Sequence, residues 1–241
     1  NELGYFVGCE SLLRWPTMDP QWNIQEVIDV AENSGLILDV GEQVIDMALA
    51  KISHLTTLGI KKWVSINISP LQFQFQDVPK IISLALVKYN VDPSMLVVEV
   101  TENIFLENIT RVAAILNQLS KMGIKIAIDD FGSGYSSLRY VQLLPIDKIK
   151  IDKVFIDNVG SSDESQGIVK AVINMSHSLG YKVVAEGVET EGQLDVLKGI
   201  GCDFIQGYYF SKPVSFDQLL ELKDFSVSAP LVLKTHLGRT L

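Results

Sequence analysis

Short apolar runs, rich in β-branched residues, alternate with longer amphipathic segments along the whole chain. Seven of these runs have the length and composition of β-strands, and they cover residues 6–13, 62–69, 95–102, 124–131, 146–152, 181–188 and 203–210. Two of the segments between them, 108–123 and 165–180, have the pattern of helices and end in a glycine that suits a left-handed cap. This order predicts an α/β fold with a parallel sheet and helical crossovers.

The length of the chain and its strand count favour a single TIM-like (β/α)8 barrel. Its 241 residues are 47% apolar, which is enough for one large core, and no Gly/Ser/Pro-rich linker divides them. An eight-stranded barrel needs one strand more than the seven, and the sequence opens almost inside the first of them. We therefore expect the N-terminal strand to be partly missing. The alternation fades near residue 223, which predicts a barrel at 1–222 and a C-terminal appendage at 223–241.

Net charge and cysteine usage restrict the class of ligand and the compartment. A formal charge of -9 argues against broad binding to nucleic-acid polymers, so a phosphate-ester ligand would need a bound cation to reverse the local sign. No apolar run is long enough for a membrane helix, and the N-terminus lacks the order of a secretion signal. Cys9 and Cys202 lie in apolar runs without metal-ligand spacing, which indicates small buried side chains in a reducing, cytoplasmic setting.

Every predicted strand carries polar residues inside it or just after it. In a (β/α)8 barrel the carboxyl ends of the strands converge on one face, where active sites are built. One polar residue at a strand end is ordinary, but a carboxylate that follows a buried run costs free energy unless it is paired, hydrogen-bonded or metal-bound. The residues expected at this face are Glu10, Arg14, Asn67, Glu99, Glu102, Asp129, Asp130, Lys150, Asp152, Glu186, Glu189 and Gln206.

The chemistry of this set favours hard divalent cations. Carboxylate and amide oxygens suit Mg2+ or Mn2+, and the adjacent Asp129 and Asp130 could serve two ions at once, as in two-metal displacement at phosphorus. Lys150, within the acidic set, is either a structural counter-ion or a proton-handling group, and the pattern favours neither. None of the three histidines ends a strand, and no nucleophile elbow or P-loop occurs. The stretch 129–138 suits either a mobile lid or a tight connection.

Seven motifs in order make the chain resemble a known family. They read "ESLLR", "SINISPLQF", "VVEVTEN", "IDDFGSGYSSL", "PIDKIKIDKVF", "VVAEGVET" and "GCDFIQGYYFSKP". Over about residues 4–222 the chain resembles the EAL-domain cyclic di-GMP phosphodiesterases. The resemblance implies a barrel with one antiparallel strand near its start, and Mg2+- or Mn2+-dependent hydrolysis of cyclic di-GMP to linear pGpG. It also implies a homodimer and, in a longer parent protein, sensory or GGDEF domains upstream and a possible membrane tether.

The resemblance also assigns roles by motif position. Metal ligands would be Glu10, Asn67, Glu99 and Asp129 for one ion, and Asp129, Asp130 and Glu186 for the second. Lys150 would orient or deprotonate the attacking water, with Glu186 and Glu189 as further catalytic groups. Leu12, Arg14, Asp152 and Gln206 would contact the substrate, with Gln206 also supporting the site. Glu102 would anchor the loop at 129–138.

Three departures from the family pattern concern positions outside the acidic set. Ser11 replaces the Ala of the signature, and strand alternation turns it away from Glu10 and Leu12. Leu71 stands where the family often has Arg, and Asp29 where Pro is frequent, which bears on substrate affinity.

Two alternatives to an active phosphodiesterase are a non-catalytic cyclic di-GMP receptor and an enolase-like Mg2+ barrel with Lys150 as base. The complete set of acidic residues favours the phosphodiesterase.

Overall fold

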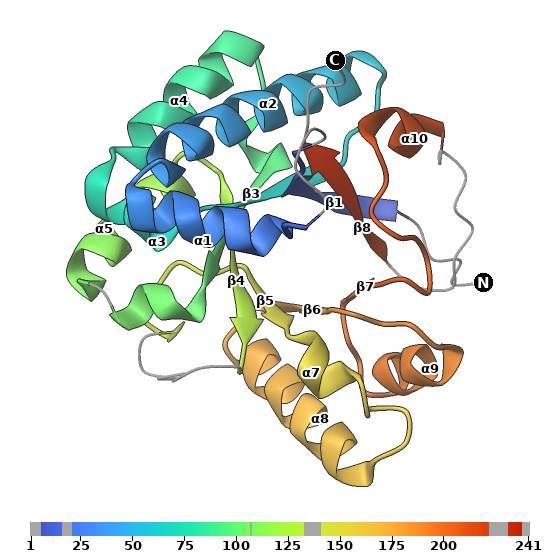
Figure 1. The fold of residues 1–241 in the computed structure, drawn as a ribbon. Helices are drawn as coiled ribbons and strands as arrows, with labels where there is room; N and C mark the ends of the chain where they lie inside the picture. The colour runs from blue at the N-terminus through green and yellow to red at the C-terminus, as the bar shows by residue number, and fades with distance from the viewer. Residues whose placement is uncertain (1–5, 16–20, 107, 133–140, 222–230, 238–241) are drawn as a thin grey trace.

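The computed structural model describes residues 6–15, 21–106, 108–132, 141–221 and 231–237. Within these residues eight strands close into a barrel in chain order, and each neighbouring pair is parallel (Figure 1). The fold class predicted from the sequence is confirmed. The strands are β1 (Phe6–Leu13), β2 (Trp63–Asn67), β3 (Leu96–Thr101), β4 (Lys125–Phe131), β5 (Lys148–Ile151), β6 (Lys182–Ala185), β7 (Phe204–Gln206) and β8 (Leu231–Leu237).

Helices connect the strands and lie around the outside of the barrel (Figure 1). Both predicted helix ends are confirmed, since Gly123 and Gly180 follow α5 and α8 with φ of 95° and 83°. The α-helices are α1 (Ile24–Ser34), α2 (Ile37–Thr57), α3 (Pro70–Phe75), α4 (Val78–Tyr89), α5 (Ile109–Lys121), α7 (Lys153–Ile156), α8 (Asp163–Ser178), α9 (Glu191–Gly199) and α10 (Phe216–Glu221). Two 3-10 helices, η1 (Pro93–Met95) and η2 (Glu102–Leu106), precede and follow β3.

The eighth strand of the barrel differs from the expectation. Residues 231–237, assigned from the sequence to an appendage, form β8, which pairs with β1 over Phe6–Leu13 and with β7 at Ile205 and Gln206. Two open sheet edges, on β1 and β7, expose unpaired backbone groups that a parallel strand can satisfy. Among the described residues no strand pair is antiparallel, and β8 takes the place between β7 and β1. The short alternation of 231–237 is too weak a signal to identify a strand by itself.

Alternation along the strands separates the site from the core. Residues such as Val98, Ile128 and Ile149 are fully buried in the core cluster beneath the helices. Their neighbours in sequence point to the opposite face of the sheet, into the barrel. Glu99 and Lys150 belong to this inward set. One face of each strand therefore supplies apolar packing, while the other supplies the polar interior.

Two aspartates hold the amino ends of strands that lead into the site. Asp203, just before β7, accepts hydrogen bonds from the Val183 backbone N–H (2.9 Å) and from Lys182 (2.7 Å) at the start of β6. Asp147, just before β5, accepts the equivalent bonds from Ile126 (3.0 Å) and Lys125 (2.8 Å) at the start of β4. Each carboxylate thus fixes one strand against the next at the face opposite the site.

Candidate active site

Lys150 lies at the centre of a ring of carboxylates inside the barrel. Its Nζ is 2.7 Å from Glu99 Oε2, 2.7 Å from Glu186 Oε1, 2.9 Å from Asp129 Oδ1 and 3.5 Å from Glu10 Oε2. The lysine is 2% exposed, and Glu10 and Glu99 are each 3% exposed. Three carboxylates within strands and one just after a strand therefore meet in a nearly dry space around one ammonium group. We call these four residues and Lys150 the acidic ring.

Two side-chain amides hold the Glu10 carboxylate within the acidic ring. Asn67 Nδ2 donates to Glu10 Oε1 at 3.0 Å, and Gln206 Nε2 donates to Glu10 Oε2 at 2.8 Å. Both residues end their strands, β2 and β7. The strand at 6–13 thus carries a carboxylate that is oriented from both sides before any ligand arrives.

Burial and mutual repulsion shift the pKa values of the site. Burial lowers the pKa of Lys150, but the carboxylates of Asp129, Glu10 and their neighbours outweigh it, and the pKa lies well above its ordinary value. Burial raises the pKa of Glu99 to about 8, although Lys150 opposes the change. Burial, and then the charge of Asp129, raise the pKa of Asp130 to about 6. The ring has more negative charge than one lysine can balance.

The structure brings most of the predicted site residues to this face. Asp130 follows Asp129 in β4 and has a φ of 52°. Asp152 caps α7 by accepting from Val154 N at 2.7 Å, and its side chain is near enough to Asp130 to raise the pKa of that carboxyl further. Leu12 is near the end of β1 on the side of Glu10, and Arg14 follows that strand.

Glu189 and Glu102 are not among the carboxylates that form ion pairs with Lys150 in the described residues. Glu189 forms an ion pair with Lys153, both half-exposed, and accepts no contact from Lys150 in the described structure. Glu102 begins η2 and is 5% exposed. The loop that it was predicted to anchor is described only to Gly132, because residues 133–140 lie outside the described part.

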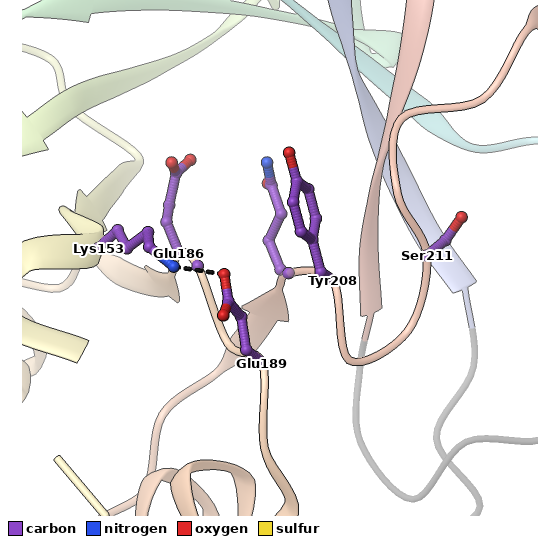
Figure 2. Close-up of a pocket in the computed structure, with 8 residues that line it drawn as sticks. Lys153, Glu186, Glu189, Tyr208 and Ser211 are labelled. Atoms are coloured by element: carbon purple, nitrogen blue, oxygen red, sulfur yellow. Dashed lines mark hydrogen bonds and ion pairs between the residues drawn. The ribbon is translucent and has the colours of Figure 1, made fainter. Parts of the chain in front are cut away.

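A pocket beside the acidic ring adds residues that sequence reasoning missed. It has a volume of about 190 Å³ and is lined by Lys153, Glu186, Gly187, Glu189, Gln206, Gly207, Tyr208 and Ser211. Figure 2 shows the Glu186 carboxylate and the Tyr208 ring pointing in the same direction into this pocket, with Lys153 and Glu189 joined at its edge. Tyr208 is 55% exposed. An aromatic two positions after the Gln206 strand end was the available signal for this wall.

Two glycines allow the walls of this pocket to approach each other. A Cβ at Gly207 would overlap the backbone of Val188, and one at Gly187 would overlap the Lys153 side chain. Backbone hydrogen bonds from Val188 N to Gln206 O (3.1 Å) and from Tyr209 N to Val188 O (3.0 Å) join the same two segments. The end of β7 and the loop after β6 are therefore fixed against each other.

The donor set of the ring fits a hard divalent cation. Carboxylate oxygens of Glu10, Glu99 and Asp129 all lie within 4.8 Å of one another. Gln206 Oε1 is buried and has no hydrogen-bond partner within the described residues, so an acceptor is left for a ligand. Buried oxygen donors with excess negative charge are the ligands that Mg2+ and Mn2+ prefer.

Ser11 follows Glu10 in β1, where the alternation of side chains turns it to the face opposite Glu10. It is 3% exposed, and its hydroxyl has no hydrogen-bond partner in the described part of the chain. We expect Ser11→Ala to change turnover less than about threefold and to raise the free energy of unfolding slightly, since a buried hydroxyl without a partner costs about 1 kcal/mol or more. Steady-state assays and urea unfolding measure both effects. A tenfold rise in turnover would show that Ser11 limits the site.

The fold and the site together define an α/β barrel with an acidic centre toward the carboxyl ends of its strands, whose oxygen donors fit a divalent cation. The model of the EAL domain matches residues 2–213, so this chain belongs to the EAL-domain family. The signaling protein YkoW of Bacillus subtilis is 42% identical over 212 residues, which cover 88% of this chain and 26% of YkoW. The chain thus spans about a quarter of the length of that relative.

Solved structures of the family are similar over most of the chain. One is the phosphodiesterase of MucR from Pseudomonas aeruginosa in complex with cyclic di-GMP, with a TM-score of 0.77, 38% identity and coverage of 83% of each chain. Another is BlrP1 of Klebsiella pneumoniae in complex with manganese and cyclic di-GMP, with a TM-score of 0.67 and 32% identity over 73% of this chain and 44% of that one. The MucR protein is named as a bifunctional diguanylate cyclase and cyclic di-GMP phosphodiesterase.

Proposed function

We propose that this EAL domain hydrolyses cyclic di-GMP to linear pGpG with the help of two divalent cations, Mg2+ or Mn2+. The observation that carries the proposal is the acidic ring, in which three buried carboxylates and the partly buried Glu186 share one lysine. Solved relatives that bind cyclic di-GMP, one of them with manganese, support the choice of substrate and of cofactor class. No carboxylate of the predicted set is replaced, which favours the enzyme over a receptor.

The residues divide between the two proposed cations as the motif positions imply. Glu10, Asn67, Glu99 and Asp129 would hold one, and Asp129, Asp130 and Glu186 the other. Bound there, the cations supply positive charge and Lewis acidity for the attack of water on phosphorus. Membership of the EAL-domain family argues against the alternative of an enolase-like barrel that acts on a carbon acid.

The side chains of the chain bind, orient and move protons around that centre. Lys150 is held protonated, so it serves as a hydrogen-bond donor to water and phosphate oxygen more readily than as a base. Glu186 contacts Lys150 and also lines the pocket, which makes its carboxylate the proposed acceptor of the proton from water. Arg14, at the end of β1, would bind a phosphate of the substrate.

Tyr208 supplies an aromatic surface at the pocket where a guanine base can stack. We expect Tyr208→Ala to raise KM by roughly 5- to 150-fold, because stacking between a base and an aromatic ring contributes about 1–3 kcal/mol. Tyr208→Phe keeps the ring and is the matched control, with KM within about twofold of the wild type. Equal KM values for Ala and Phe would exclude stacking at this position.

The test of the proposed function is a product assay. Purified domain is incubated with cyclic di-GMP and Mn2+, and the products are separated by chromatography, with linear pGpG expected. Protein carrying Asp130→Asn, purified in the same way, controls for contaminating hydrolases. Binding of cyclic di-GMP without any cleavage would reject the enzyme and support the receptor alternative.

The assembly and location of the parent protein stay predictions. No helix of the described residues is long and apolar enough to cross a membrane. A cytoplasmic site of action fits a second messenger as substrate. The homodimer implied by the resemblance would use the segment at 129–138, most of which lies outside the described residues.

A further inference from the structure

The ammonium group of Lys150 lies among the carboxylates that would bind a cation. Three carboxylate oxygens, from Glu99, Asp129 and Glu186, surround Nζ at 2.7 to 2.9 Å. Two of those residues also belong to the cluster whose oxygens converge within 4.8 Å. The N–H donors of the lysine thus pair with carboxylates that a divalent cation would also need.

The carboxylates of the acidic ring cannot bind the Lys150 ammonium group and a divalent metal ion at the same time. Mg2+ requires ligand oxygens at about 2.0–2.1 Å in near-octahedral geometry, which draws carboxylates inward and away from a neighbouring ammonium. Two positive groups in a buried space also repel each other strongly. If neither the ammonium group nor a metal ion were present, four carboxylates would face each other in a nearly dry interior, which is a strongly destabilising arrangement.

We propose that Lys150 is a tethered counter-ion that is displaced by metal loading. In the metal-free protein its ammonium holds the acidic ring together, and entry of divalent cations moves it off at least one shared carboxylate. The inference rests on the proposed metal site. It predicts opposite effects of removing the charge: the metal-free fold becomes less stable, while the metal binds more tightly.

Lys148 offers a matched control on the same strand. It precedes Lys150 by two residues, faces the same side of β5 and is 9% exposed. Its Nζ lies 3.6 Å from the centroid of the Trp63 ring, and within the described residues no carboxylate is within ion-pairing distance of it. Its replacement removes a buried lysine from the same strand without removing a cation from the acidic ring.

The experiment compares Lys150→Met and Lys148→Met with the wild type, using Mn2+ alone as the probe. Calorimetric titration is expected to show at least about tenfold tighter Mn2+ binding for Lys150→Met and a change within about threefold for Lys148→Met. In thermal unfolding with excess chelator, the midpoint of Lys150→Met should lie about 10 °C or more below that of the wild type. This is the size expected when one partner of a buried ion pair is lost. Saturating Mn2+ should recover most of that loss. Lys148→Met should lose the same stability with and without Mn2+.

Each remaining outcome decides the matter. Mn2+ binding by Lys150→Met that is equal to or weaker than that of the wild type overturns the inference alone, and absence of Mn2+ binding to the wild type overturns both the inference and the proposed function. A Lys150→Met protein that folds only with Mn2+ supports the inference. Should it fold under neither condition, carbon NMR of the lysine ε-carbons in the wild type decides: Mg2+ must shift the Lys150 signal and leave that of Lys148 in place, and an unshifted Lys150 signal overturns the inference.

Discussion

Asp130→Asn is expected to lower turnover at least about a hundredfold, which corresponds to about 2.7 kcal/mol of lost transition-state stabilisation. The variant keeps the size of the side chain and removes one negative charge from the proposed ligands of the second cation. The backbone of Asp130 is left-handed, with a φ of 52°, and Asn tolerates that conformation as well as Asp does. The substitution therefore tests charge without adding backbone strain.

Affinity for cyclic di-GMP should suffer far less than turnover in this variant. Glu10, Asn67, Glu99 and Asp129 still provide ligands for one cation, and Arg14 is unchanged. An interaction that acts mainly in the transition state lowers turnover without a matching loss of ground-state binding. Calorimetric titration and product release, measured at the same metal concentration, give the two quantities. Loss of binding in proportion to turnover would place Asp130 among the substrate contacts instead.

Removal of divalent cations is expected to reduce hydrolysis to the background rate. Negative charge at the acidic ring repels a phosphodiester until cations neutralise it. Mg2+ or Mn2+ should restore activity, and Ca2+ should restore less, because its larger and looser coordination shell fits a tight two-cation arrangement poorly. The assay follows pGpG release after dialysis against chelator and stepwise return of each metal.

A monovalent control separates cation chemistry from ionic strength. Potassium at matched ionic strength should leave the dialysed protein inactive, while circular dichroism checks that the barrel stays folded. Full turnover in excess chelator, after tightly bound metal has been removed, would contradict the two-cation model.

Much of the barrel could be predicted from the sequence because most strands carry a strong local signal. Residues 6–13 were predicted as a strand and form β1, and the runs around Val98 and Ile128 form β3 and β4. The strand at 231–237 was missed, since its identity depends on pairing with β1 and β7, which are far away in sequence. Pairing of distant segments leaves little trace in local periodicity.

The sequence could predict which residues converge at the site, but not which of them are in contact. Sequence reasoning left Lys150 open between counter-ion and proton-handling group, and its four ion pairs depend on barrel closure. The contact of Glu189 with Lys153 joins residues 36 positions apart, at the edge of the pocket. Tyr208 was missed because an exposed aromatic after a strand is common and carries no charge signal.

The alternation of inward and outward side chains makes the strands intolerant of length changes. Glu99 lies in the acidic ring while its neighbours Val98 and Val100 lie in the core cluster beneath the helices. A single-residue insertion within β3 would exchange the two faces from that point onward. It would put a carboxylate among the helices and an apolar side chain in the ring. Insertions and deletions in this domain should therefore accumulate in the loops at the face opposite the site, while its strands keep their lengths.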